Sequence, residues 1–128
     1  MSTQPIRHDA ALVPAAALRD WATRCFAAAG MTHDDAALLA SSLVQTSLWG
    51  IDSHGVGLLP HYLERLANGT INARPLVAVH RTAPATALIE ADQGHGIVVA
   101  HRAMAEAVRI AREQGVGAVG VKNASHCG

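Results

Sequence analysis

The stretch that decides the fold is GVGAVGVKNASHCG, residues 115–128. Residues 116–121 are apolar at both odd and even positions, which is typical of a strand buried on both faces. The polar side chains of Asn123, Ser125 and His126 come directly after this run. Because ligands commonly bind beyond the carboxyl ends of strands in layered α/β structures, we expect a functional site here.

The first half of the chain predicts helices. Apolar residues recur at helical spacing in three segments: from Pro14 to Gly30, from Thr32 to about Trp49, and over residues 57–67. The first helix is expected to bury Trp21 and Phe26 on one face. Thr32 and Asp35 resemble a capping box at the start of the second helix.

The second half predicts a different layer. Two short strands are expected at residues 76–79 and 86–89, and a fourth helix then leads from Gly94-His95-Gly96 to Gly115. On that helix the pairs Arg102–Glu106 and Arg109–Glu113 are spaced i,i+4, which predicts a solvated face. The expected fold class is α/β, in the order strand-strand-helix-strand after the helices. Two other strands are few for a buried strand, so the sheet is expected to be incomplete.

The composition excludes several classes of partner. Ten Lys and Arg balance ten Asp and Glu, so no net charge attracts nucleic acid or anionic lipid. No apolar run approaches the roughly 20 residues that span a bilayer. Cys25 and Cys127 lack C-x-x-C spacing and a disulfide framework. We therefore expect a soluble protein of the reducing cytoplasm.

Residues 115–120 spell G-x-G-x-x-G, the dinucleotide-binding fingerprint. The fingerprint must come after a strand and open a helix, whereas here it comes after a helix and leads into a strand. We interpret these glycines as a helix stop joined to a tightly packed strand. Gly94-His95-Gly96 lies at a helix start, where free amides attract anions, but a structural turn is the favoured interpretation.

Asp52-Ser53-His54-Gly55, between two helices, is a stronger candidate. In an extended segment residues i and i+2 share a face, so Asp52 would orient His54 while Ser53 points elsewhere. An imidazole here can donate and accept a proton near neutral pH. A structural histidine at a helix start is the alternative. For His126 and Cys127 the alternative is a metal site, but adjacent residues rarely reach one ion together, and we expect none.

Two motifs, together with the sequence around them, resemble the malate/L-lactate dehydrogenase family. This family also contains ureidoglycolate dehydrogenase and related ketoacid and imine reductases, and it is unrelated to the Rossmann-type malate and lactate dehydrogenases. The resemblance runs from about residue 13 to the last residue. The stretches that carry it are GIDSHGVGLLPHY (50–62), NGTIN (68–72) and AVGVKNASHCG (118–128).

The resemblance implies a NAD- or NADP-dependent oxidoreductase that transfers hydride between a 2-hydroxy acid and its 2-keto acid. Residues 1–73 would be a helical substrate-binding and dimerisation region, and residues 74–128 the beginning of a non-Rossmann NAD(P)-binding domain. It assigns acid/base roles to His54 and His126 and substrate binding to Ser53, with most cofactor contacts beyond residue 128.

Many members of the family carry an arginine just after the Ser-His-Gly motif, whereas this chain has Leu58 at the equivalent position. The resemblance also implies homodimers. We expect a truncated chain that is inactive alone. A rival hypothesis is a non-catalytic helical dimerisation module derived from the same family.

Overall fold

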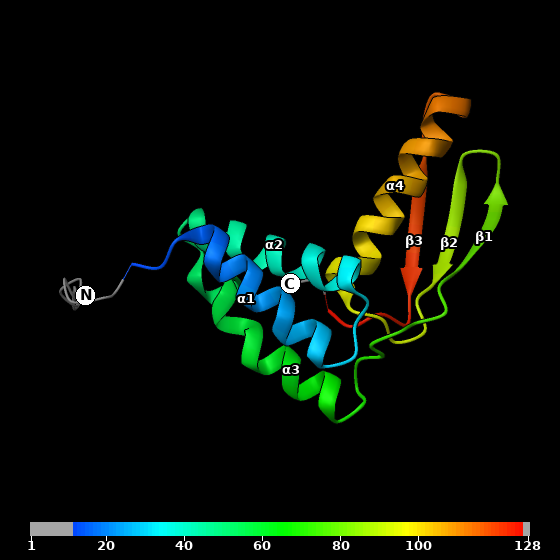
Figure 1. Cartoon of the computed structure of the whole chain (residues 1–128). Helices are drawn as coiled ribbons and strands as arrows, with labels where there is room; N and C mark the ends of the chain where they lie inside the picture. Colours follow the sequence, from blue (N-terminus) through cyan, green and yellow to red (C-terminus); the bar gives the residue numbers. More distant parts are fainter. Residues whose placement is uncertain (1–11, 127–128) are drawn as a thin grey trace, which may run out of the picture.

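The computed structural model describes residues 12–126, in which a layer of helices lies beside a small sheet (Figure 1). The helices are α1 (Ala15–Ala28), α2 (His33–Leu48), α3 (Leu59–Ala67) and α4 (Gly96–Gln114). The strands are β1 (Ala78–Ala83), β2 (Thr86–Glu90) and β3 (Ala118–Lys122). Two 3-10 turns, Asp52–His54 and Val56–Leu58, connect α2 to α3.

The sheet confirms the predicted α/β class and element order. β1 and β2 form an antiparallel hairpin, and β2 pairs in parallel with β3, so α4 is the crossover between two parallel neighbours. The ladder from Thr86↔Ala118 to Glu90↔Lys122 brings the carboxyl ends of β2 and β3 to one edge. The segments that continue from these two strands therefore start from the same side of the sheet.

The helical layer has its own core. Phe26 of α1, Leu39 and Leu43 of α2, and Tyr62 of α3 are almost fully buried together. Thr32 caps α2 as predicted, because its hydroxyl accepts from the backbone N–H of Asp35 at 3.3 Å. The prediction for Trp21 was wrong: this side chain lies at the edge of the α1 stripe and is 47% exposed.

The prediction that β3 is buried was also wrong for the described residues. Only Val119 is even half-buried among its five residues. β3 is the last strand of the sheet, with β2 on one side and no strand described on the other. Apolar residues at every position indicate that both faces of a strand can be buried. Whether they are buried depends on the elements that pack against the strand.

The glycines of residues 115–120 serve packing, as the sequence indicated. Gly115 ends α4 with φ of +83°, a left-handed conformation that favours glycine. A Cβ atom on Gly117 would collide with the carbonyl oxygen of Ala107, so only glycine lets β3 start this close to α4.

One ion pair joins the helical layer to the sheet layer. Arg102 of α4 donates from one guanidinium nitrogen to both carboxylate oxygens of Asp35 on α2, each at 2.8 Å. The predicted Arg102–Glu106 pair is therefore wrong, because Glu106 binds Arg109 instead, at 2.6 Å. Sequence spacing indicates neighbours on one helix, but it cannot reveal an acid on another.

Within residues 12–126, no helix combines the length and apolarity that crossing a lipid bilayer requires.

We expect the Arg102–Asp35 pair to contribute more to stability than an ordinary surface pair, since the Asp35 side chain is only 11% exposed. A double-mutant cycle with Arg102→Ala and Asp35→Ala should give a coupling energy of about 1–2 kcal/mol in urea unfolding. The matched control is the exposed Arg109–Glu113 pair, for which about 0.3–0.5 kcal/mol is expected. Equal coupling in the two cycles would contradict a special role for the inter-layer pair.

Candidate functional site

The candidate site forms where the segments after β2 and β3 meet the start of α4. Backbone bonds hold these segments together: Gln93 N–H donates to the Asn123 carbonyl at 2.7 Å, and Ser125 N–H donates to the Gly94 carbonyl at 3.0 Å. The residue that opens α4, Gly96, donates its N–H to Ser125 Oγ at 2.9 Å. A Cβ atom on Gly96 would collide with the carbonyl oxygens of both Ser125 and His126.

This close approach directs the end of the described chain back toward the helical layer (Figure 1). There the ring of His126 lies 5.9 Å from the ring of Tyr62 and 6.4 Å from that of His61, measured between centroids. Tyr62 also receives the ring of His95 edge-on at 4.3 Å. We call His61, Tyr62, His95 and His126 the ring cluster.

The ring cluster has a buried side and an exposed side. Tyr62 and His95 are 1% and 2% exposed, whereas His61 and His126 reach solvent. The four residues come from α3, from the N-cap of α4 and from the segment after β3. The site therefore exists only when both layers are in place.

His95 is held neutral. Its Nδ1 accepts from the backbone N–H of Ile97 at 3.3 Å and so caps α4, which assigns the proton of the neutral ring to Nε2. Burial, with smaller effects from His126 and Arg65, lowers the pKa of His95 from 6.5 to about 4. The buried Nε2 has no hydrogen-bond partner among residues 12–126.

The Asp-Ser-His-Gly turn differs from its predicted geometry. Residues 52–54 form a 3-10 turn, not an extended segment, and Ser53 Oγ lies 2.8 Å from His54 Nδ1. The prediction that Asp52 orients His54 while Ser53 points away was therefore wrong, because the 3-10 backbone changes which side chains are neighbours. Ser47 of α2 anchors the second 3-10 turn, since its hydroxyl accepts from Val56 N–H at 2.9 Å.

The structure thus gives the predicted site residues two different settings. His126 lies in the ring cluster, whereas Asp52, Ser53 and His54 lie exposed on the turn before α3. No ring contact in the described part of the chain joins His54 to His126.

Sequence reasoning missed His61, Tyr62 and His95 as site residues. The sequence pattern makes Tyr62 an apolar helix residue and His95 part of a turn. One signal in the sequence could have indicated His95 as a site residue. It comes shortly after a strand, as His126 does, and these two strands are parallel neighbours in the sheet.

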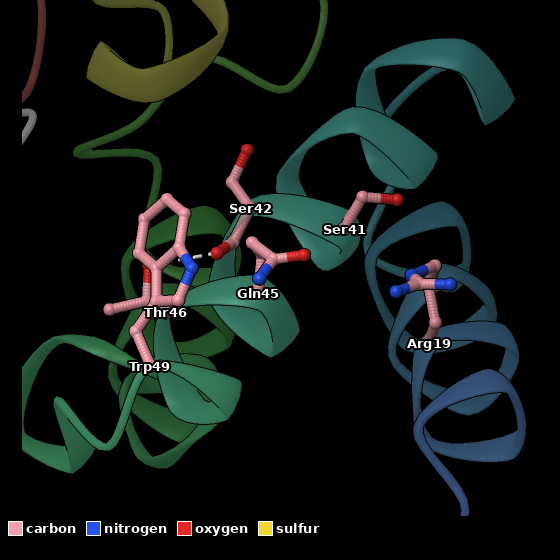
Figure 2. A pocket seen from close by; sticks show the side chains of 6 residues that line it. All are labelled: Arg19, Ser41, Ser42, Gln45, Thr46 and Trp49. Carbon is pink, nitrogen blue, oxygen red and sulfur yellow. Dashed lines mark hydrogen bonds between the residues drawn. The ribbon is translucent and has the colours of Figure 1, made fainter.

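The described residues form no metal centre. Within residues 12–126, no group of three His, Cys, Asp or Glu side chains lies close enough to hold a metal ion. A groove of about 510 Å³ does lie between α1 and α2, lined by Arg19, Ser41, Ser42, Gln45, Thr46 and Trp49 (Figure 2). It contains none of the predicted site residues, and the ring cluster is the stronger candidate on chemical grounds.

Comparison with known proteins identifies relatives of this chain. Residues 13–128 match the family described as malate/L-lactate dehydrogenase. The chain is 36% identical over 116 residues to the malate dehydrogenase of Pyrococcus abyssi, covering 91% of this chain and 32% of that protein. It is 40% identical over 99 residues to the L-sulfolactate dehydrogenase of Methanocaldococcus jannaschii, covering 77% of this chain and 29% of that protein.

The fold agrees with a solved structure. The malate dehydrogenase of Pyrococcus horikoshii superposes with a TM-score of 0.91 at 33% identity, covering 98% of this chain and 36% of that one. The chain therefore spans about a third of the length of the relatives that it matches.

We expect His95 to make the fold sensitive to acid. Because its folded pKa is about 4 and its unfolded pKa about 6.5, the unfolded chain binds the extra proton between these values, and stability falls as pH falls through this window. The loss on going from pH 7 to pH 5 should be about 2 kcal/mol from this residue.

The measurement is urea unfolding at the two pH values for the wild type and for His95→Asn. Asparagine can still cap α4 but does not titrate, so its loss of stability over the same interval should be smaller by about 2 kcal/mol. An equal loss in the two proteins would show that His95 is not the acid-sensitive group.

Proposed function

Because this chain belongs to the malate/L-lactate dehydrogenase family, we propose that it takes part in the reversible NAD(P)-dependent oxidation of a 2-hydroxy acid to its 2-oxo acid. The observation that carries the proposal is the family match, supported by a histidine cluster at the carboxyl edge of two parallel strands. The relatives are dehydrogenases of small hydroxy acids. The chain spans about a third of their length, so the activity is proposed for the gene product that contains these residues.

We assign the proton transfer to His126. In the oxidation the imidazole would take the hydroxyl proton of the substrate, and in the reduction the imidazolium would return a proton to the carbonyl oxygen. Support comes from its solvent-facing ring, which lies beside the buried Tyr62 and beyond the end of a strand. NAD or NADP would supply the hydride chemistry itself.

We assign substrate binding to Ser53 and His54, with Asp52 as a supporting residue of the same turn. Ser53 Oγ at 2.8 Å from His54 Nδ1 fixes the ring so that Nε2 points away from the hydroxyl. His54 would then offer one nitrogen to a substrate oxygen. It is also the second candidate for moving the proton, since its side chain is exposed as well.

The described residues do not fit a dinucleotide site. Gly115 and Gly117 are used for a helix end and for packing, and two amides at the start of α4 are already bound by Ser125 and His95 side chains. Neither the G-x-G-x-x-G stretch nor this helix start therefore offers an amide cradle for a pyrophosphate. We propose that the cofactor contacts lie mainly in the part of the relatives that extends beyond this chain.

The same proposal covers the organisation of the protein. Residues 1–73 would form the substrate and dimerisation region and residues 74–128 the beginning of the cofactor domain. We further propose a homodimer in the cytoplasm.

The test is an assay of the purified gene product with NADH and NADPH on 2-oxo acids such as pyruvate and oxaloacetate. We expect turnover, and we expect His126→Asn to lower kcat at least about 100-fold, as the loss of a general acid does. His54→Asn should mainly raise KM. The isolated 128 residues, which span about a third of the relatives, should show no turnover.

The control is His101→Asn, which removes an exposed imidazole from α4 outside the ring cluster and should change neither constant. A large loss of kcat in His54→Asn with little loss in His126→Asn would reverse the two assignments. Absence of any 2-oxo acid reduction by the gene product would refute the proposed function.

A further inference from the structure

His61 has no role in the reaction described so far, yet it stands on the exposed side of the ring cluster. It precedes Tyr62 on α3, with their ring centroids 5.6 Å apart, and it faces His126 at 6.4 Å. Its ring reaches solvent, whereas Tyr62 beneath it does not. A ligand that reached His126 from solvent would therefore also meet His61.

We propose that His61 is a specificity residue that, as a protonated imidazole, binds the carboxylate of the substrate beside His126. The identity of the substrate rests on the proposed function. The position of the His61 imidazole beside His126 rests on the geometry of the ring cluster.

The surroundings of His61 favour an anion. From α3 it is accompanied by Tyr62 and, one turn further, by Arg65, whose Nε donates to the Thr70 hydroxyl at 3.3 Å. From the start of α4 the cluster receives His95, which is neutral, and from the segment after β3 it receives His126. Arg65 has no ion pair with an acid in the described part of the chain, and Glu64, one turn from His61 on α3, forms no ion pair with His61 there. Arg65 therefore stands one turn from His61 without an ion-pair partner among the described residues.

The spacing of the two exposed rings also suits a carboxylate. At 6.4 Å between centroids the imidazoles do not share a hydrogen bond, and no direct bond between them is present in residues 12–126. A carboxylate would accept from His61, while the hydroxyl or carbonyl oxygen on the adjacent carbon lies toward His126. A 2-hydroxy or 2-oxo acid bound this way keeps its reacting oxygen near His126, where the proton transfer has been assigned.

Replacing His61 with arginine, which stays charged, distinguishes a carboxylate-binding role from a structural one. In the gene product, His61→Gln should raise KM for the 2-oxo acid about 10-fold with a much smaller change in kcat, because it removes binding common to ground and transition states. His61→Arg should restore KM to within about 3-fold of the wild type, since arginine stays charged and can hold a carboxylate. The matched surface control is His101→Gln on α4, with KM and kcat unchanged.

The pH profile gives the second readout. For the wild type KM should rise with increasing pH, because an imidazole binds an anion more tightly in its protonated form. For His61→Arg this rise should be smaller, since arginine keeps its charge over this range. A merely structural role for His61 would give His61→Arg the same pH profile as the wild type, and that result would overturn the inference.

A binding measurement keeps the inference separate from the reaction. Oxamate, a carboxylate that cannot be reduced, is titrated into the gene product without cofactor while the histidine ring signals are followed by NMR. Signals of both His61 and His126 should move together and saturate. If only His126 responds, the carboxylate role of His61 is refuted while the proposed function stands. If both respond but no 2-oxo acid is reduced, the anion site is supported and the proposed function fails.

Discussion

The candidate site depends on one close approach of two backbones. The carbonyl groups of Ser125 and His126 lie directly over Gly96, where no side chain atom fits, and the Ser125 hydroxyl accepts the N–H of the same glycine. This contact turns the segment after β3 back over the start of α4. Without it the ring cluster would lose His126, one of its two exposed members. The polar residues of the last motif are therefore positioned by a glycine that is distant in the sequence.

The second constraint is the joining of the two layers. The ring cluster draws His61 and Tyr62 from the helical layer and His95 and His126 from the sheet layer, so any shift between layers changes its distances. The Arg102–Asp35 pair spans the same boundary, and Val98 of α4 packs into the helical core. Arg102 and Val98 both belong to α4, and His95 caps the start of this helix. α4 therefore holds one end of the ring cluster and also joins the helical layer to the sheet layer.

The sequence predicted the helices, the α/β class and the element order because these depend on local periodicity and on glycine stops. It also predicted that residues 115–120 are structural, and the positions of Gly115 and Gly117 agree with this. The features that it could not predict depend on partners distant in the sequence. Arg102 was paired with the wrong acid, β3 was expected to be buried, and the Asp52–His54 turn was given an extended geometry.

The candidate site was predicted only in part for the same reason. His126 was found because it comes after a strand-like run, and its place in a cluster with Tyr62 is a property of the fold. His95 looked like a turn residue, since no local pattern reveals that its ring is buried against α3. A histidine becomes part of a site through contacts that cross the chain, and single-sequence patterns contain little information about these.

The separate core of the helical layer has a consequence for judging preparations of this protein. Phe26, Leu39 and Tyr62 can pack together before the parallel pairing of β2 with β3 is complete, because all three side chains come from the first three helices. A molecule arrested at that stage would give nearly the full circular dichroism of α1, α2 and α3, yet His126 would have no fixed place. Helical content is thus a poor indicator of competence, and the near-ultraviolet signal of Tyr62, whose ring packs against both His95 and His126, is the better one.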